Sequence, residues 1–367
     1  MEALEYPIPR EHPIPTKHDR LKPAPSTPAS ANCILRIGAE EPDDRLRETL
    51  QERVFDASHS ADVAMPDLLL WDETGLRYFE DVTFCPPYYL TDEEIGILER
   101  QKYGIAARVE SGSMLVELGS GNLRKTRILL DALDKLGKEV DYFALDVSFT
   151  ELQRTLSAIP PGTFRHVRCF GIFGTYDNAR EWLRRPGVAT RSKTLLFLGS
   201  TLGGFQRDEA AAFLSSFVPE SPQPGELLPS FLIGLDGCKQ PQRVYDAYND
   251  SVGVNRRFVR HGLERANEIL GDDAFDPEKW DIVGCWDQAR GCHNQYYIAK
   301  ENLCLAGAAV PAGRRILAIQ SHKYDAADRE TLCRAAGLGL VDLWSSSGQY
   351  QVCYLRPLYA SHGNQRV

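Results

Sequence analysis

The chain has 367 residues, enough for one large domain or two, and its hydrophobic share of 43% and charged share of 25% are ordinary for a globular protein. Its formal net charge of −9 argues against a general nucleic-acid binder. Apolar runs stop well short of the roughly 20 residues that a membrane helix needs. We therefore expect neither nucleic acid nor a membrane as a partner, and a monomer or a weak homo-oligomer.

The first 32 residues contain many prolines and charges and no apolar core. This composition predicts a disordered tail and does not fit a secretory signal. The nine cysteines are scattered without a CxxC pair, and the neighbours Cys285, Cys292 and His293 fit no common metal-ligand spacing. We expect reduced thiols, no metal site and a cytoplasmic location.

Residues 33–91 are predicted to begin with a short strand and a charged helix and to continue as an aromatic segment. Thr91, followed by three acids, has the pattern of a helix N-cap with acids in the first turn. The aromatic side chains before it fit either an ordinary core or a ligand site that uses their polar atoms. The residues concerned are Trp71, Phe79, Tyr88 and Tyr89.

Residues 114–133, MLVELGSGNLRKTRILLDAL, have the pattern of a strand, a glycine turn and a helix. The apolar run closes on Glu117, and the turn contains Gly119, Ser120 and Gly121. In a nucleotide-binding α/β unit, such glycines let a ligand lie against bare backbone, with helix N–H groups aimed at it. Many loops need small residues simply to turn, so a binding loop and a structural turn both stay open.

A second apolar run, residues 140–148, ends with Asp146 before a serine. In nucleotide-binding α/β folds, the acid at the end of the second strand accepts hydrogen bonds from ribose hydroxyls. Two successive strands that end in an acid indicate a ligand site better than either one does. Helix caps or loop acids remain an alternative for Glu117 and Asp146.

Strand–helix alternation continues through residues 164–183 and 194–217 to a strand at 231–235, and residues 337–359 predict an antiparallel hairpin. Such alternation predicts a mainly parallel sheet with its ligand at the carboxyl ends of the strands. The block 239–323, with turns at Gly307 and Gly313, is too long for a crossover. We expect it to form a second subdomain with the aromatic segment, and a ligand cleft between that subdomain and the sheet.

The glycine turn lacks the third glycine of the dinucleotide fingerprint, because Arg124 stands in its place. An acid at the end of the first strand is unfavourable beside a pyrophosphate but favourable beside a cation. S-adenosylmethionine carries a sulfonium and an ammonium and no phosphate, so it fits Glu117 better than a dinucleotide does. A parallel sheet finished by an antiparallel hairpin also fits the class I, Rossmann-like methyltransferase topology. An NAD-type oxidoreductase is the alternative.

Five segments resemble, in this order, the histidine-specific methyltransferase family: ELGSGNLRKTRILLDAL, ALDVS, FLGSTLGGF, AYNDSVGVNRRF and QSHKY. That family includes the histidine Nα-trimethyltransferases of ergothioneine synthesis and the fungal 4-dimethylallyltryptophan N-methyltransferases. The segment GIFGTYDNA (residues 171–179) is closer to the fungal branch. The resemblance covers nearly the whole chain after about Cys33.

The resemblance implies a two-part organisation, with S-adenosylmethionine on the sheet and an amino acid in a pocket shared with the inserted domain. Residues 33–91 and 240–320 would then bind the substrate, and residues 92–239 and 321–367 the cofactor. The implied cofactor-binding residues are Glu117, Gly119, Ser120, Gly121, Lys125, Asp146, Gly199 and Ser200. The implied substrate-binding residues are Trp71, Phe79, Tyr88, Gly204, Tyr248, Gln295, Ile319 and Ser321, with Tyr88 and Tyr248 orienting the amino acid for catalysis.

Two departures from the histidine enzymes bear on the substrate. Gly204 stands where those enzymes have an asparagine that anchors the amino acid, and Ile319 stands where a glutamate pairs with the imidazole. An acid replaced by isoleucine favours an apolar ring. We therefore expect an N-methyltransferase that acts on the α-amino group of an aromatic or prenylated aromatic amino acid, in fungal alkaloid metabolism. The alternatives are a histidine Nα-methyltransferase that reads the imidazole through Gln295 or Ser321, and a catalytically silent S-adenosylmethionine-binding protein.

Overall fold

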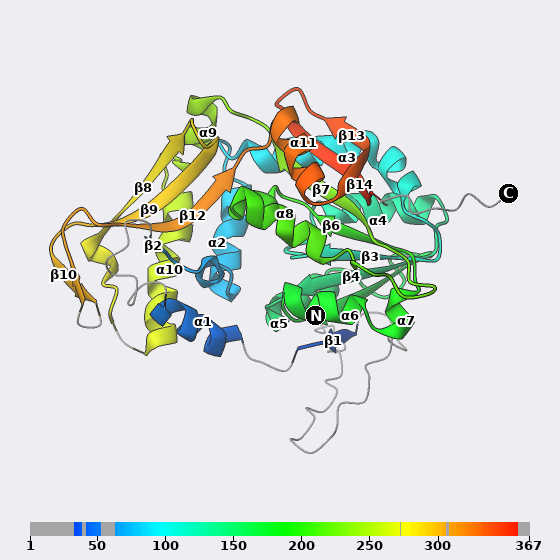
Figure 1. Ribbon diagram of the computed structural model, residues 1–367, viewed down its shortest axis with the longest axis horizontal. Coiled ribbons are helices and arrows are strands. Elements are labelled where there is room, and N and C mark those ends of the chain that lie inside the picture. Colours follow the sequence, from blue (N-terminus) through cyan, green and yellow to red (C-terminus); the bar gives the residue numbers. More distant parts are fainter. Residues whose placement is uncertain (1–32, 39–41, 53–62, 272, 306–307, 359–367) are drawn as a thin grey trace, which may run out of the picture.

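Figure 1 shows a large sheet with helices on both faces, a smaller sheet at the other end of the molecule, and helix α2 (Glu73–Thr83) between them. The predicted tail at residues 1–32 and the predicted turn at Gly307 lie outside the described part of the chain. The computed structural model describes residues 33–38, 42–52, 63–271, 273–305 and 308–358.

Six neighbouring strands of the large sheet run parallel, and strand β14 runs antiparallel to both of its neighbours. The antiparallel pairing of the last two strands confirms the predicted C-terminal hairpin. Across the sheet, the described strands follow the order β1 (Ile34–Arg36), β5 (Val167–Phe173), β4 (Val140–Asp146), β3 (Ser113–Leu118), β6 (Lys193–Phe197), β7 (Ser230–Asp236), β14 (Tyr350–Pro357) and β13 (Leu338–Ser345).

Helices cover both faces because successive residues of the parallel strands point into two different hydrophobic cores. In β3, Leu115 belongs to one core, whereas Met114 and Val116 belong to the other. The first core is closed by α3 (Tyr89–Arg108), α4 (Thr126–Lys135) and α5 (Phe149–Ser157). The second is closed by α6 (Tyr176–Leu183), α7 (Pro186–Ala189), α8 (Arg207–Ser216) and α11 (Ala326–Ala335).

Strand β3 lies at the point where the strand order reverses. From β3 the chain moves to β4 and β5 on one side of the sheet and then returns to β6 on the other. In open α/β sheets, ligands bind outside the carboxyl ends of the strands at such a point. The order of the strands, with antiparallel β14 between β7 and β13, is the class I methyltransferase topology and confirms the predicted fold class.

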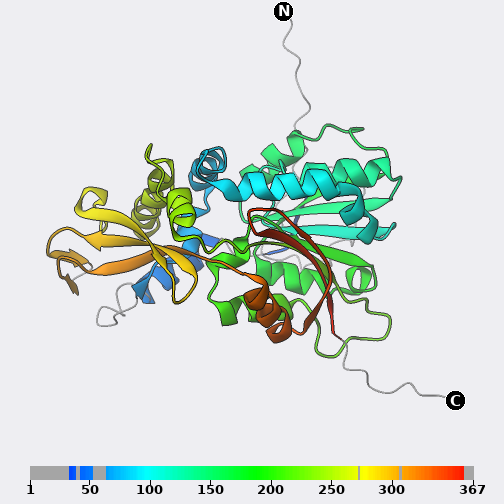
Figure 2. The same ribbon diagram turned by 90° about the horizontal axis from the view of Figure 1, so that it is seen from above.

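The smaller sheet is built mainly from the inserted block, in the order β2 (Val63–Ala64), β12 (Arg315–His322), β9 (Cys292–Ala299) and β8 (Trp280–Asp287). Helix α10 (Val254–Leu270) packs against α2 and against the short helix η2 (Asp67–Leu70). Figure 2 shows this sheet and α10 to one side of the long helix α3. The remaining described elements are α1 (Pro42–Leu50), η3 (Thr201–Gly204), α9 (Pro241–Tyr248), η4 (Pro277–Lys279), β10 (Leu303–Leu305) and β11 (Ala308–Val310).

Two predictions differ from the structure. Residues 34–36, assigned to the substrate-binding part, form β1 and pair with β5, which covers backbone groups that β5 would otherwise expose at the sheet edge. Helix α3 begins at Tyr89, so Thr91 lies inside the helix and does not cap it. The reason is tertiary, because Tyr88 and Tyr89 are both buried and a tight turn precedes them. The rest of the predicted two-part division stays a prediction.

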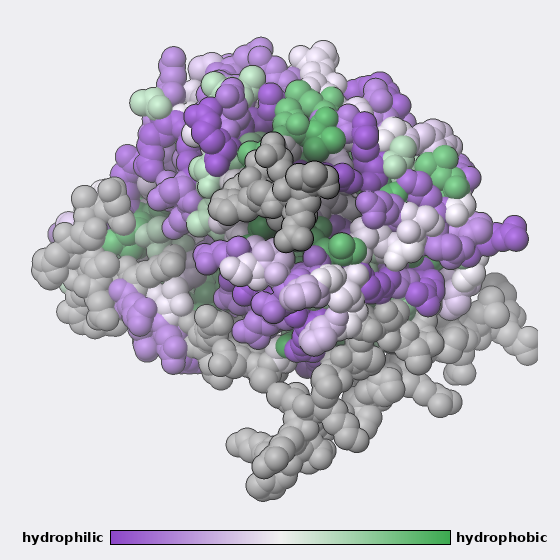
Figure 3. All heavy atoms as spheres, turned by 45° about the vertical axis from the view of Figure 1, so that its right-hand side comes forward, coloured by the Kyte–Doolittle hydropathy of each residue, from purple (hydrophilic) through white to green (hydrophobic). Residues whose placement is uncertain are grey.

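The surface is mainly hydrophilic on the face that Figure 3 draws, and hydrophobic residues form small groups there. Within the described ranges, every helix is too short or too polar to cross a membrane.

Candidate active site

The glycine turn after β3 is held against the end of β4. The backbone N–H groups of Gly119 and Ser120 both donate to the carbonyl oxygen of Leu145. Gly119 and Gly121 have φ angles of +79° and +50°, which favour glycine. A Cβ at Gly121 would meet no atom within 4 Å, so open space lies beside the turn. The buried hydroxyl of Ser120 has no hydrogen-bond partner among the described residues.

Two acids lie at the ends of the neighbouring strands β3 and β4. The Asp146 carboxylate accepts a hydrogen bond from the Ser148 N–H at 3.0 Å, and burial raises its pKa to about 6. Glu117 is also buried, and its two oxygens accept hydrogen bonds from the hydroxyls of Thr126 and Tyr142. Burial raises the pKa of Glu117 to about 7. Its carboxyl group is therefore engaged with protein hydroxyls, which the sequence pattern did not predict.

A buried carboxylate on α3 joins two of the predicted cofactor-binding segments. Glu94 forms an ion pair with Lys125 at 2.8 Å, and its side chain is fully buried. It also accepts hydrogen bonds from the Gly199 N–H and from the Tyr350 hydroxyl, each at 2.9 Å. Glu94 therefore ties the turn after β3 to the turn after β6.

The turn after β6 has a strained backbone. Gly199 and Ser200 have φ angles of +82° and +57°, and the second value is uncommon for a residue with a side chain. The Ser200 hydroxyl accepts a hydrogen bond from the Asp236 N–H at 3.0 Å. This contact fixes the turn against the end of β7.

Beyond this turn lies a fully buried ion pair between Asp236 and Lys323, at 2.8 Å. Strand β12 delivers Lys323 from the smaller sheet, and the following residue, Tyr324, donates its N–H to the Asp236 carbonyl oxygen. The Lys323 Nζ also donates to Tyr248 Oη at 2.8 Å and to Ser321 Oγ at 3.2 Å. The two hydroxyls lie 2.8 Å apart. Two predicted substrate-binding side chains are thus linked to the edge of the large sheet.

A row of aromatic rings extends from Tyr248 into the smaller part of the molecule. The ring centroids of Tyr248 and Tyr88 are 5.7 Å apart, those of Tyr88 and Phe79 6.1 Å, and those of Phe79 and Trp71 5.1 Å. His293 stacks on Tyr248 at 4.6 Å. Burial lowers the pKa of His293 to about 3, so the ring is neutral near pH 7. The structure therefore brings the predicted substrate-lining aromatics together.

The remaining predicted substrate positions lie beside this row. Half-buried Ile319 on β12 pairs in register with Gln295 on β9. The Gln295 amide donates to the Tyr248 carbonyl oxygen at 3.2 Å and to Asn255 at 2.7 Å, so it holds the backbone of Tyr248. A Cβ at Gly204 would meet no atom within 4 Å, so an asparagine side chain has room there.

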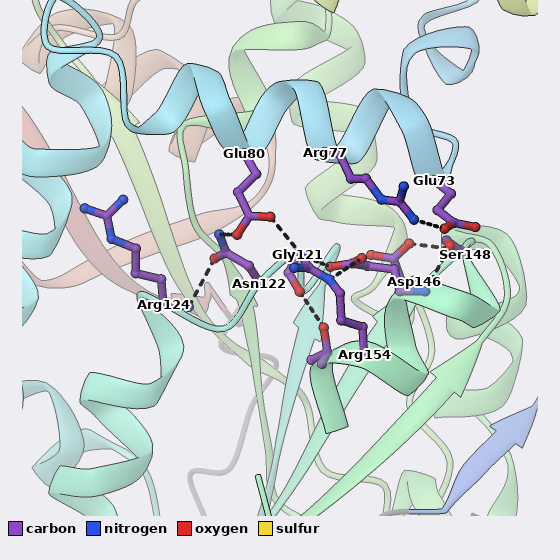
Figure 4. Close-up of polar contacts among 11 residues, drawn as sticks. Glu73, Arg77, Glu80, Gly121, Asn122, Arg124, Asp146, Ser148 and Arg154 are labelled. Atoms are coloured by element: carbon purple, nitrogen blue, oxygen red, sulfur yellow. Dashed lines mark hydrogen bonds and ion pairs between the residues drawn. The ribbon is translucent and has the colours of Figure 1, made fainter. Parts of the chain in front are cut away.

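Helix α2 covers the glycine turn and connects to it through Glu80 (Figure 4). Glu80 accepts a hydrogen bond from the Asn122 amide at 2.9 Å and forms an ion pair with Arg154 at 3.2 Å. Asn122 belongs to the turn after β3, and Arg154 belongs to α5. A second pair, Arg77 with Glu73, stays within α2.

The family model described as histidine-specific methyltransferase, S-adenosylmethionine-dependent, matches residues 45–357. The chain belongs to this family. Membership confirms the resemblance and the predicted cofactor, S-adenosylmethionine.

Three relatives are similar to most of this chain. Ergothioneine biosynthesis protein 1 of Neurospora crassa is 42% identical over 288 residues, 78% of this chain but only 32% of that protein, so this chain spans about a third of its length. The N-methyltransferase fsqC of Aspergillus fumigatus is 34% identical over 304 residues, covering 81% of this chain and 80% of fsqC. The 4-dimethylallyltryptophan N-methyltransferase easF of Arthroderma benhamiae is 32% identical over 314 residues, covering 83% and 92%. These matches confirm the predicted enzyme class, an S-adenosylmethionine-dependent N-methyltransferase.

The side chains of this family member fit its cofactor. The unpartnered Ser120 hydroxyl and the open space beside Gly121 lie at the turn, and Asp146 lies at the end of the next strand. A buried polar group without a partner is unfavourable, and a ligand with hydroxyl, ammonium and carboxylate groups would supply one. Contacts of individual residues with the cofactor stay predictions.

Sequence patterns missed several residues of this methyltransferase site. Glu94 was taken only as a helix acid, and Lys323 only as part of the QSHKY segment. A buried ion pair across distant segments has no local signature, so neither partner could be assigned from spacing. His293 was weighed only as a metal ligand, and Phe258, whose ring lies 5.3 Å from those of both Trp71 and Phe79, lies in a segment used only for family resemblance.

Proposed function

We propose that this enzyme methylates the α-amino group of an aromatic or prenylated aromatic amino acid of the 4-dimethylallyltryptophan type. The observation that carries the proposal is Ile319, an apolar residue two positions before Ser321 on β12, where the histidine enzymes have an acid. A hydrophobic wall favours an apolar ring, and a buried imidazole there would lack its partner. The fungal relatives named as 4-dimethylallyltryptophan N-methyltransferases support this choice.

Histidine is the second candidate substrate. Ser321 is retained, and the 42% identity to ergothioneine biosynthesis protein 1 is the highest among the relatives described above. Gly204 and Ile319 both count against histidine because each lacks a polar group that would contact it. A catalytically silent binding protein is the third alternative, and it predicts cofactor binding without turnover.

In the proposed reaction, the amine lone pair attacks the methyl group on the sulfonium of S-adenosylmethionine. The nitrogen–methyl bond forms as the sulfur–methyl bond breaks, S-adenosylhomocysteine leaves, and the methylated ammonium can release its proton to water. The protein mainly has to align the amine and exclude water. A free α-amino group has a pKa of about 7.7–8.0, so a useful fraction is neutral near pH 7 without a strong base. Tyr88 and Tyr248 orient the amino acid, and burial raises the pKa of Tyr88 well above its usual value, so its hydroxyl stays protonated.

A methylation screen tests the proposed substrate. The purified enzyme is incubated with S-adenosylmethionine and with histidine, tyrosine, tryptophan or 4-dimethylallyltryptophan, and products are identified by mass. We expect N-methylated products from the aromatic substrates and the highest kcat/KM for the prenylated one. Preferred methylation of histidine would replace the proposal with the second candidate. Cofactor binding without turnover on any of the four would favour the silent protein.

The predicted location and assembly belong to the same proposal. All nine cysteines lie in the described ranges and are free thiols there, which supports a reducing compartment such as the cytosol. We expect a monomer or a weak homo-oligomer, and light scattering would measure the molar mass that decides between them.

A further inference from the structure

The Lys323–Asp236 pair places a positive charge behind the substrate side of the site without exposing it. Both side chains are fully buried, whereas Ser321 and Ile319 on β12, which ends one residue before Lys323, are half-buried. A bound molecule can therefore reach the Ser321 hydroxyl but not the ammonium group itself. Any effect of the Lys323 charge on a ligand therefore acts through the Tyr248 and Ser321 hydroxyls that the ammonium group contacts.

The hydrogen-bond partners found for the Asp236 carboxylate are groups other than those two hydroxyls. Its Oδ2 accepts hydrogen bonds from Tyr89 Oη at 2.7 Å and from Lys323 at 2.8 Å, and its Oδ1 accepts one from the Cys238 N–H at 2.9 Å. The pair therefore acts as a dipole whose positive end faces Tyr248 and Ser321. Burial by itself lowers the pKa of Lys323, but Asp236 and Tyr248 raise it above its usual value, so the ammonium stays charged.

Counting protons shows whether the two hydroxyls can still donate a hydrogen bond to a ligand. The three protons of the ammonium group are directed at Asp236, Tyr248 and Ser321. Tyr248 and Ser321 share one hydroxyl proton in the hydrogen bond between them. Tyr88 also hydrogen-bonds to Tyr248, so three hydroxyls are joined by two bonds and one hydroxyl proton is left over. The oxygens of Tyr248 and Ser321 already accept a bond from Lys323. The cluster therefore presents a donor, strengthened by the charge behind it, and such a donor suits an anionic acceptor.

We propose that Lys323 is a positioning residue that makes the enzyme require a free α-carboxylate on its substrate, by turning the hydroxyls of Tyr248 and Ser321 into carboxylate donors. Because this role builds on the proposed amino-acid substrate, it predicts which related amines the enzyme rejects. An amine with the same side chain but no carboxylate leaves the charged cluster without its partner. An amino acid satisfies it and is anchored beside the turn that Asp236 fixes through Ser200.

The experiment compares each amino acid that the screen identifies with the matching amine that lacks the carboxylate, such as tryptophan with tryptamine. For the wild type we expect kcat/KM for the amino acid to exceed that for the amine roughly 10- to 100-fold, the range that a hydrogen bond to a charged group supplies. In the variant Lys323→Gln we expect most of this preference to disappear through a higher KM for the amino acid, with kcat/KM for the amine nearly unchanged.

A single change at Lys323 leaves Asp236 buried without its partner, which endangers folding. The double variant Lys323→Gln/Asp236→Asn removes both charges, and Tyr248→Phe removes one hydroxyl while keeping the ion pair. Both are expected to lose the preference while binding S-adenosylmethionine like the wild type in calorimetry. Tyr297→Phe is the matched control, because this buried tyrosine donates to the Val259 carbonyl oxygen, away from the cluster, and the preference should persist.

The possible outcomes separate the two proposals. Equal kcat/KM for amino acid and amine in the wild type, or an unchanged preference in the double variant, overturns the role of Lys323 and leaves the N-methylation of aromatic amino acids intact. If the methylation screen shows that histidine is the preferred substrate, the proposal of an aromatic substrate is wrong. The comparison of histidine with histamine in the same variants then tests Lys323 by itself.

Discussion

At the end of β4, Asp146 has one carboxylate oxygen engaged with the Ser148 N–H, and we predict that the carboxylate also holds the ribose of S-adenosylmethionine. Replacing Asp146 with Asn should raise the dissociation constant of the cofactor roughly 10- to 100-fold, because hydrogen bonds to a charged group are lost. Titration calorimetry measures this constant. Equal binding by variant and wild type would remove Asp146 from the cofactor contacts.

The control for this variant is Asp141→Asn, at the opposite end of the same strand. Asp141 is buried and paired with Arg168 and Arg191, so its replacement disturbs folding about as much. It lies away from the carboxyl edge, and we expect cofactor affinity within about twofold of the wild type, the spread that changes remote from a binding site produce.

We predict that positions 204 and 319 decide the choice between an apolar ring and an imidazole. Gly204 has open space for a longer side chain, and Ile319 lies on β12 two residues before Ser321. The double variant Gly204→Asn/Ile319→Glu restores both groups that the family resemblance assigns to histidine binding. We expect kcat/KM for histidine to rise at least about tenfold and kcat/KM for the aromatic substrate to fall, as polar pockets discriminate strongly.

Mass detection of the methylated products in competition assays measures this change. The single variant Gly204→Asn is the control, because it restores the amino-acid anchor without the imidazole partner and should not favour histidine over the aromatic substrate. Unchanged selectivity in the double variant would show that Ile319 does not set the substrate.

Among the elements, α2 has the clearest mechanical role, since it covers the glycine turn and touches it through Glu80 (Figure 4). We predict that Glu80→Gln raises the dissociation constant of S-adenosylmethionine about two- to fivefold, the size of a partly exposed ion pair. The reason is that Asn122 in the turn and Arg154 on α5 both lose a charged partner. The constant is measured by calorimetry.

The matched control lies on the same helix. Glu73 pairs only with Arg77, four residues along α2, among the contacts found in the described chain. Glu73→Gln should leave cofactor affinity unchanged. If both variants weaken binding equally, the effect comes from α2 itself and not from its link to the turn.

For the whole molecule, the buried acid Glu117 predicts how stability changes with pH. Its pKa is about 7 in the folded protein against a usual 4.5, so between these values the folded protein holds a proton that the unfolded chain has released. The contribution of Glu117 therefore falls as pH rises from about 4.5 to 7, by roughly 3 kcal/mol at most. Glu117→Gln removes this dependence.

Denaturant unfolding without cofactor, from pH 5 to pH 8, measures the effect. The variant should gain stability relative to the wild type as pH rises, because it never has to ionise in the core. A difference between the two proteins that stays constant over this range would contradict the raised pKa.

The central architecture and the cofactor could be predicted from local sequence patterns. The strands around Val116 and Phe143 are buried on both faces, so they appear in the sequence as continuous apolar runs. Such runs can be recognised without knowledge of the tertiary structure. The glycine turn and Asp146 lie at the carboxyl ends of the neighbouring parallel strands β3 and β4, so the strand–helix–strand pattern was enough to bring them together. The N-cap assigned to Thr91 failed because burial of Tyr88 and Tyr89 outweighed a local capping preference.

The cluster on the predicted substrate side could not be predicted in this way, because it depends on contacts between distant segments. Lys323, Asp236 and Tyr248 come from three separate segments, and they meet because β12 runs from the smaller sheet to the carboxyl end of β7. No sequence periodicity predicts this contact, because an ion pair depends on the distance between atoms in space and not on the separation of the residues along the chain. A charge buried in this way acts on the ligand through neighbouring hydroxyls, and which hydroxyls these are is fixed only once the two sheets are joined.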